Sequence, residues 1–173
     1  SIKDFAAAKV GGDPSIPVVM AVGDYIIVGG GTIMFAPPGR GKSYVALSMA
    51  ISADAGTSKV WPVPKAQKAL YVNLERSKES IQRRIGQCNG ALDLEPGRPM
   101  LVLNARGKSL ADVRYAVESA VKNDGVEVLF LDSISRSGQG SLLGDQETNS
   151  TIDLLNNLCP TWLAIGHTPR SDD

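Results

Sequence analysis

The sequence lacks the features that mark secreted and membrane proteins. It contains two cysteines, Cys88 and Cys159, which lie far apart and form no C-x-x-C pair. We therefore expect reduced, structural thiols in a cytoplasmic protein, and a disulfide between them is the weaker alternative. No hydrophobic run reaches the length of a membrane span, and residues 1–10 lack the basic start and apolar core of a secretory signal. These absences predict a protein with no membrane partner.

An excess of charge of either sign is also missing. The chain has 18 Lys and Arg against 18 Asp and Glu, so its formal net charge is zero and there is no overall attraction to nucleic acid or anionic lipid. DNA binding by a local patch stays open. The chain does have apolar content, because 43% of its 173 residues are hydrophobic, which suits one globular domain with a buried core. We expect a single domain over residues 1–173, in which residues 1–23 form a lead-in segment.

The most informative stretch runs from Ala36 to Ser43 and reads APPGRGKS. It fits the phosphate-binding pattern G-x-x-x-x-G-K-[ST], with Ala36 where the first glycine is usual. Gly39 and Gly41 allow the backbone to curl around an anion and to present N–H groups at the positive end of the following helix. Lys42 adds a positive charge for the β- and γ-phosphates, and the Ser43 hydroxyl is suited to a phosphate-bound Mg²⁺.

The alternative for this stretch is a plain Gly/Pro turn with a solvated Lys42. Its context favours phosphate binding, because an apolar run at 32–35 precedes it and a helix-like segment at 43–53 follows it. The predicted nucleotide-binding residues are Ala36, Pro37, Pro38, Gly39, Arg40, Gly41, Lys42, Ser43 and Tyr44.

Apolar runs and helical spacing alternate along the rest of the chain. Strands are predicted at 25–28 and 32–35, which we expect to form a hairpin through the glycines at 29–31, and at 69–74, 99–104, 126–131 and 161–166. Helices are predicted at 43–53, 77–87, from 109 to the break at 123–125, and at 145–158, with a mobile loop at 133–144. Arg83 and Arg84 are expected on a solvated helix face. The alternation predicts a three-layer α/β domain with a mainly parallel sheet.

Polar residues follow several of these strands. The phosphate loop, Glu75, Asp132 and His167 each stand at a strand end, and ligands of such sheets bind at the carboxyl ends of the strands. We therefore expect these four elements to converge.

Each of the three strand-end side chains has a chemical and a structural interpretation. Asp132 follows an apolar strand and is suited to holding Mg²⁺ opposite Ser43, although such a residue can simply cap a turn. Glu75 is placed to accept a proton from, or to orient, the water that attacks the γ-phosphate, although Glu also begins helices well. His167, the single histidine, would donate to the γ-phosphate and sense hydrolysis, unless it is structural.

Four segments together resemble the RecA-like ATPases, specifically the branch of plasmid RepA-type hexameric replicative helicases. The segments are 36–43, Leu70-Tyr71-Val72-Asn73-Leu74-Glu75, Val128-Leu129-Phe130-Leu131-Asp132-Ser133 and Ile165-Gly166-His167-Thr168. The resemblance implies a RecA-like fold that binds ATP and Mg²⁺. The resemblance further implies that Lys42 binds phosphate and Ser43 binds the metal. It also implies that Glu75 is the catalytic glutamate, Asp132 the Walker B acid and His167 the γ-phosphate sensor.

The resemblance also implies a homo-oligomeric ring, with six subunits the family's size. The loop after the Walker B strand faces the ring's channel in this family and can touch single-stranded DNA. That loop begins Ser137, Gly138, Gln139, Gly140 and Ser141, and up to residue 144 it has no lysine and no aromatic residue. Arg136 and Arg170 are candidate contacts to phosphate, a neighbouring site or nucleic acid, or else solvated charges. The family continues after its His-Thr strand with strands that this sequence does not contain.

The leading hypothesis is an Mg²⁺-dependent ATP-hydrolysing motor that works as a ring-forming DNA helicase in replication. One alternative keeps the fold but makes the chain a regulatory or helicase-loader ATPase that remodels a protein partner, and the uncharged loop favours it. Another is a small-molecule phosphotransferase, which the phosphate loop permits. If Glu75 is only structural, the chain is a nucleotide-binding module without hydrolysis.

Overall fold

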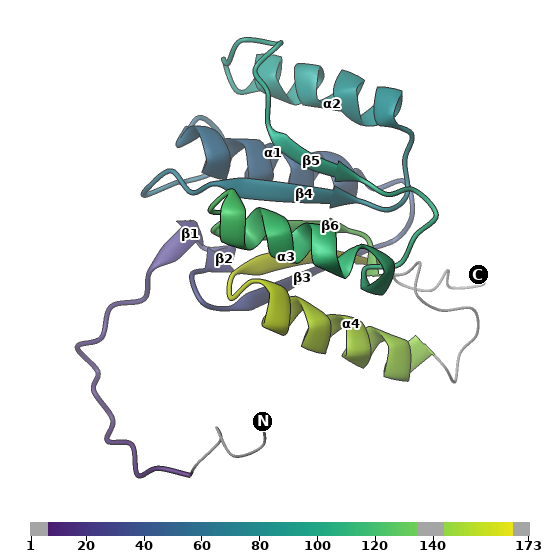
Figure 1. The fold of residues 1–173 in the computed structure, drawn as a ribbon. Helices are drawn as coiled ribbons and strands as arrows, with labels where there is room; N and C mark the ends of the chain where they lie inside the picture. Colours follow the sequence, from purple (N-terminus) through teal and green to yellow (C-terminus); the bar gives the residue numbers. More distant parts are fainter. Residues whose placement is uncertain (1–6, 135–143, 168–173) are drawn as a thin grey trace.

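The computed structural model describes residues 7–134 and 144–167, and Figure 1 shows their arrangement. The elements in chain order are β1 (Met20–Val22), β2 (Ile26–Ile27), β3 (Gly31–Ala36), α1 (Lys42–Ala55), β4 (Ala69–Asn73), α2 (Lys78–Ala91), β5 (Leu101–Asn104), the 3₁₀ turn η2 (Ala111–Val113), α3 (Arg114–Asn123), β6 (Val128–Asp132), α4 (Gly144–Leu158) and β7 (Trp162–His167).

The central sheet has five strands in the order β3-β7-β6-β4-β5, and every described neighbour pair in it is parallel. Helices α1 and α2 lie on one face, whereas α3 and α4 lie on the other (Figure 1). This arrangement confirms the predicted three-layer α/β fold with a parallel sheet.

The side chains of β6 show why the sheet is covered on both faces. All five of its residues are buried, and successive side chains point to opposite faces. Val128 and Phe130 belong to the cluster beneath α1 and α2, whereas Leu129 and Leu131 belong to the cluster beneath α3 and α4. A continuous apolar run such as that at 128–131 is therefore what a doubly covered strand needs.

The predicted hairpin between 25–28 and 32–35 is wrong. β2 pairs antiparallel with β1, and β3 instead pairs in parallel with β7, from Gly31 opposite Trp162 to Ala36 opposite His167. Gly29 and Gly30 belong to a turn in which the Gly30 N–H donates to the Ile27 carbonyl at 3.1 Å, but the segments that flank it do not pair as strands. At Gly31 the Trp162 ring fills the space of a side chain, since a Cβ there would lie 2.1 Å from the ring. Close contact with β7 therefore decides the partner of β3.

Two helix boundaries differ from the sequence prediction. α2 is predicted to end at 87 but continues through Gly90 to Ala91. The predicted helix start at 109 has a cap, in which the Asp112 carboxylate accepts from the Ser109 backbone N–H at 2.8 Å. It is followed first by η2, however, and α3 begins only at Arg114. The sequence pattern therefore located both helices but not their exact ends.

The lead-in segment extends away from the layered body in Figure 1. Residues 7–19 are exposed and contain no helix or strand, but β1 lies within the predicted lead-in and joins the small two-stranded sheet. In the part of the chain that the structure describes, none of the helices is both long and apolar enough to span a membrane.

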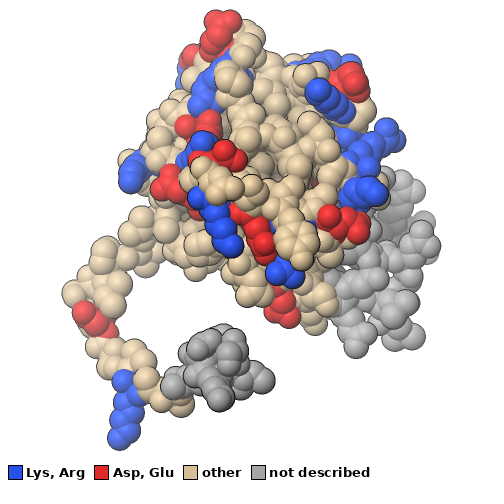
Figure 2. Space-filling view, in the orientation of Figure 1, with Lys and Arg blue, Asp and Glu red and all other residues tan. Residues whose placement is uncertain are grey.

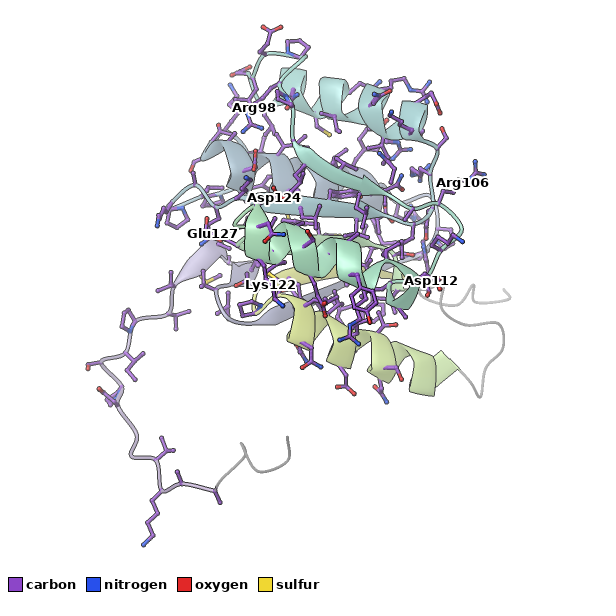
Figure 3. The ribbon with its side chains drawn as sticks, in the orientation of Figure 1. Arg98, Arg106, Asp112, Lys122, Asp124 and Glu127 are labelled. Carbon is purple, nitrogen blue, oxygen red and sulfur yellow. The ribbon has the colours of Figure 1, made fainter. Side chains whose placement is uncertain are left out.

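Charged side chains at the amino ends of the strands form contacts between the segments that connect helices and strands. In Figure 3 Arg98 and Glu127 lie at the end of the sheet opposite Arg106 and Asp112. Arg98 pairs with Asp54 at 2.7 Å, and the Glu127 carboxylate accepts from the Lys68 backbone N–H at 3.1 Å. These contacts are structural, which leaves the carboxyl ends of the strands as the place for a ligand.

Candidate functional site

The loop between β3 and α1 has the backbone that its glycines predict. Gly39 and Gly41 both have φ of 80°, in the left-handed region that favours glycine. Gly41 is the N-cap of α1, so the loop leads directly into the amino end of a fourteen-residue helix. The free N–H groups and the dipole of that end favour an anion, which suits the loop to phosphate.

Lys42 is folded over this loop. Its side chain is largely buried, with the residue 6% exposed, and the ammonium group donates to the backbone carbonyls of Ala36 and Pro37, the latter at 2.8 Å. The loop thus positions the Lys42 ammonium group at the end of β3. A phosphate group that reached the loop would meet this charge.

Three polar side chains from different strand ends meet beside the loop. The Ser133 hydroxyl, just after β6, donates to Oε1 of Glu75, which follows β4. The same oxygen lies 3.3 Å from Nε2 of His167, the last residue of β7. The Glu75 and His167 side chains are 20% and 30% exposed. The strand-end residues Glu75 and His167 are therefore brought together, with a serine that the sequence did not single out.

A cavity of about 220 Å³ joins Glu75 and His167 to the phosphate loop. Its lining includes several cationic side chains. The lining residues are Gly39, Arg40, Gly41, Lys42, Ser43, Tyr44, Glu75, Arg76, Arg84 and His167.

Asp132 lies at the inner end of the site and is fully buried. Its Oδ2 accepts a hydrogen bond of 2.8 Å from the Tyr71 hydroxyl, whereas Oδ1 has no hydrogen-bond partner among the described residues. Burial raises the pKa of this carboxyl, while the nearby hydroxyls of Tyr71 and Ser43 act in the opposite direction. Ser43 is thus close to Asp132 although it makes no hydrogen bond to Oδ1.

Arg84 is a cavity residue that the sequence reasoning missed. It was expected on a solvated face, but its side chain is half-buried and lines the cavity. Its guanidinium stacks on the Tyr44 ring, 4.1 Å from the ring centroid, and its Nε is buried without a hydrogen-bond partner in the described part of the chain. The spacing of three from buried Ile81 on α2 was the available signal, since such positions share a helix face.

Arg76 is a second missed cation at the cavity. It follows Glu75 directly, and buried Asn73 fixes its backbone: the Asn73 amide donates to the Arg76 carbonyl at 2.8 Å, and the Arg76 N–H donates back at 2.9 Å. This reciprocal pair determines how the chain leaves β4. It therefore also fixes the backbone on both sides of Glu75.

The remaining candidates lie outside the described residues. They are the loop residues Ser137, Gly138, Gln139, Gly140 and Ser141 and the two arginines Arg136 and Arg170.

Comparison with known families agrees with this geometry. A family model described as an AAA domain matches residues 4–172, which is nearly the whole chain. No curated protein matches the sequence closely enough to count as a relative. Together with the phosphate loop at the head of α1, the match shows that the chain belongs to the AAA domain family of P-loop ATPases.

Proposed function

We propose that this chain is an Mg²⁺-dependent ATP-hydrolysing motor domain whose site is the cavity beside the phosphate loop. The single observation that carries the proposal is the meeting of Glu75, Ser133 and His167 beside the phosphate loop, where Glu75 and His167 line the same cavity as Lys42 and Ser43. A plain Gly/Pro turn would not require these side chains from three strands.

The phosphate groups of ATP are the natural ligand of the loop. The backbone N–H groups at the head of α1 would bind phosphate oxygens, and Lys42 would exchange its bonds to the loop carbonyls for the β- and γ-phosphates. Arg84 is held by the Tyr44 ring and would add a further contact to phosphate oxygen. Arg40 and Arg76 raise the positive potential of the same cavity.

The residues at the inner end of the site fit a magnesium ion. Oδ1 of Asp132 is a buried oxygen without a hydrogen bond from any described residue, and the Ser43 hydroxyl lies close to the same carboxyl. No group of three or more His, Cys, Asp or Glu side chains is gathered in the described ranges, so phosphate oxygens and water would complete the shell. When bound there, Mg²⁺ would neutralise charge on the β- and γ-phosphates.

Glu75 is the residue we assign to the attacking water. Its Oε1 is anchored by the Ser133 hydroxyl and faces Nε2 of His167, so its carboxylate is held at the cavity with one oxygen committed to these contacts. The carboxylate would accept a proton from water or orient it toward the γ-phosphate. His167 would then report the state of the γ-phosphate to β7 and Glu75.

The finer proposal is a ring-forming DNA helicase of RepA type. The resemblance of the four strand-end motifs supports it, and nucleotide would lie between subunits of a homo-oligomer, six in the related proteins. The second candidate is a regulatory or helicase-loader ATPase that acts on a protein, because residues 137–144 contain no lysine or aromatic residue for single-stranded DNA. The visible face in Figure 2 also has Lys and Arg mixed with Asp and Glu, without a broad basic surface.

Steady-state ATP hydrolysis separates these functions. The rate is measured with Mg²⁺, with and without single-stranded DNA, for the wild type and for Glu75→Gln. Stimulation by DNA that Glu75→Gln abolishes supports the helicase motor. A rate that DNA leaves unchanged supports the loader or regulatory ATPase. Tight ATP binding without hydrolysis would refute the motor and leave a nucleotide switch.

A further inference from the structure

Tyr71 is a fully buried residue of β4 whose aromatic ring already has a packing role. It belongs to the cluster that also contains Phe130 and, from α1, Leu47 and Ala50. A phenylalanine would fill the same space. The hydroxyl is the group that packing does not explain, and a buried hydroxyl is costly unless it finds a partner.

The partner of this hydroxyl is the carboxylate at the inner end of the site. The register between β4 and β6 sets Tyr71 opposite Phe130 and Asn73 opposite Asp132. Asp132 therefore lies two residues beyond the partner of Tyr71, toward the carboxyl ends of the strands. The Tyr71 side chain extends in that direction, and its hydroxyl donates to Oδ2 of Asp132 at 2.8 Å. A donor on a buried, packed ring holds its direction better than a water molecule would.

The consequence for Asp132 is that its two oxygens have different surroundings. Oδ2 accepts from Tyr71, and Oδ1 receives no hydrogen bond from the described residues. The Ser43 hydroxyl approaches the carboxyl from the first turn of α1. Rotation of the carboxylate would break the bond to Tyr71, so the orientation is fixed from the side of the sheet. Partners of this kind commonly orient metal ligands.

We propose that Tyr71 is a positioning residue for the metal site, whose hydroxyl holds Asp132 so that Oδ1 is available to a phosphate-bound Mg²⁺ near Ser43. The inference rests on the proposed function, since it assigns Asp132 to the metal. It adds a residue on a neighbouring strand that never touches nucleotide.

The test is the Mg²⁺ dependence of nucleotide binding by Tyr71→Phe. Binding of a fluorescent ATP analogue is titrated at fixed Mg²⁺ concentrations and in EDTA. We expect the Mg²⁺ concentration for half-maximal effect to rise by about 10- to 100-fold, the usual cost of losing an orienting partner. Affinity in EDTA should match the wild type, and high Mg²⁺ should restore binding. The control is Tyr115→Phe, whose residue is 77% exposed on α3 and which should not change the titration.

A purely structural hydroxyl would give a different result. It would lower the melting temperature of Tyr71→Phe while leaving the Mg²⁺ half-saturation equal to that of the wild type, and this outcome overturns the inference but not the proposed function. A wild type that binds the analogue equally well with and without Mg²⁺ overturns both.

A comparison in the Asp132→Asn background keeps the test decisive if Tyr71→Phe alone does not fold, because removal of the donor leaves a buried carboxylate. In Asp132→Asn that charge is gone, so Tyr71→Phe can be added to it. The two proteins should show the same Mg²⁺ dependence if Tyr71 acts through Asp132. A further shift on adding Tyr71→Phe contradicts the proposed route.

Discussion

Glu75→Gln is the substitution that most sharply separates catalysis from binding. Oε1 of Glu75 accepts from the Ser133 hydroxyl and lies 3.3 Å from His167 Nε2. Glutamine has nearly the same shape and keeps an oxygen acceptor for Ser133, but it cannot take a proton from water. We expect kcat for ATP hydrolysis to fall by about 10²- to 10⁴-fold, which is about 3 to 5 kcal/mol in the activation barrier.

Binding and folding should change much less. The Glu75 side chain is 20% exposed and its neighbours retain partners, so the free energy of unfolding should move by no more than about 1 kcal/mol. The assay pairs single-turnover hydrolysis with equilibrium binding of ATP, and urea unfolding monitors stability. Glu79→Gln serves as the matched control, since Glu79 is an exposed residue in the first turn of α2. Hydrolysis within about 3-fold of the wild type would refute general-base catalysis by Glu75.

Three further predictions concern binding and packing. Arg84→Ala should weaken ATP binding by about 10-fold or more, because it removes a charged hydrogen-bond donor from the cavity. Arg83→Ala, at the exposed neighbouring position, should leave ATP binding unchanged. Equal affinities of the two variants in a fluorescence titration would contradict the assignment of Arg84. Gly31→Val should destabilise the fold by about 1 to 3 kcal/mol or more, because a Cβ would lie 2.1 Å from the Trp162 ring, and an unchanged urea midpoint would disprove the contact. Burial raises the pKa of both cysteine thiols, so we expect a thiol reagent to modify them only after unfolding, and rapid reaction of the native protein would argue against the buried positions.

The layered fold and the approximate place of the site were predictable because they depend on local patterns. Apolar runs such as 69–74 predict doubly covered strands, and residues that follow parallel strands must gather at one edge of the sheet. Glu75, Asp132 and His167 all lie at that edge, next to the phosphate loop. This prediction does not depend on which strands are neighbours in the sheet.

The errors concern contacts between segments that are distant in the sequence. The triple glycine at 29–31 resembles a hairpin turn, and only the Trp162 ring against Gly31 reveals why β3 joins β7. The bond from Tyr71 to Asp132 depends on the register of β4 against β6, which periodicity does not supply. Contacts between distant segments therefore determine the partner of β3 and the hydrogen bond from Tyr71 to Asp132, which local sequence patterns do not predict.

Calorimetric titration of the protein with ATP in the presence of Mg²⁺ tests the central claim most directly. The account predicts saturable binding by the wild type and a loss of about 10- to 100-fold in affinity for Lys42→Ala, which removes the charge folded over the phosphate loop. Lys122→Ala is the control, because Lys122 is exposed on α3 and lies away from the carboxyl ends of the strands in Figure 3. Equal affinity of Lys42→Ala and the wild type, or no binding by the wild type, would contradict a nucleotide site at this loop.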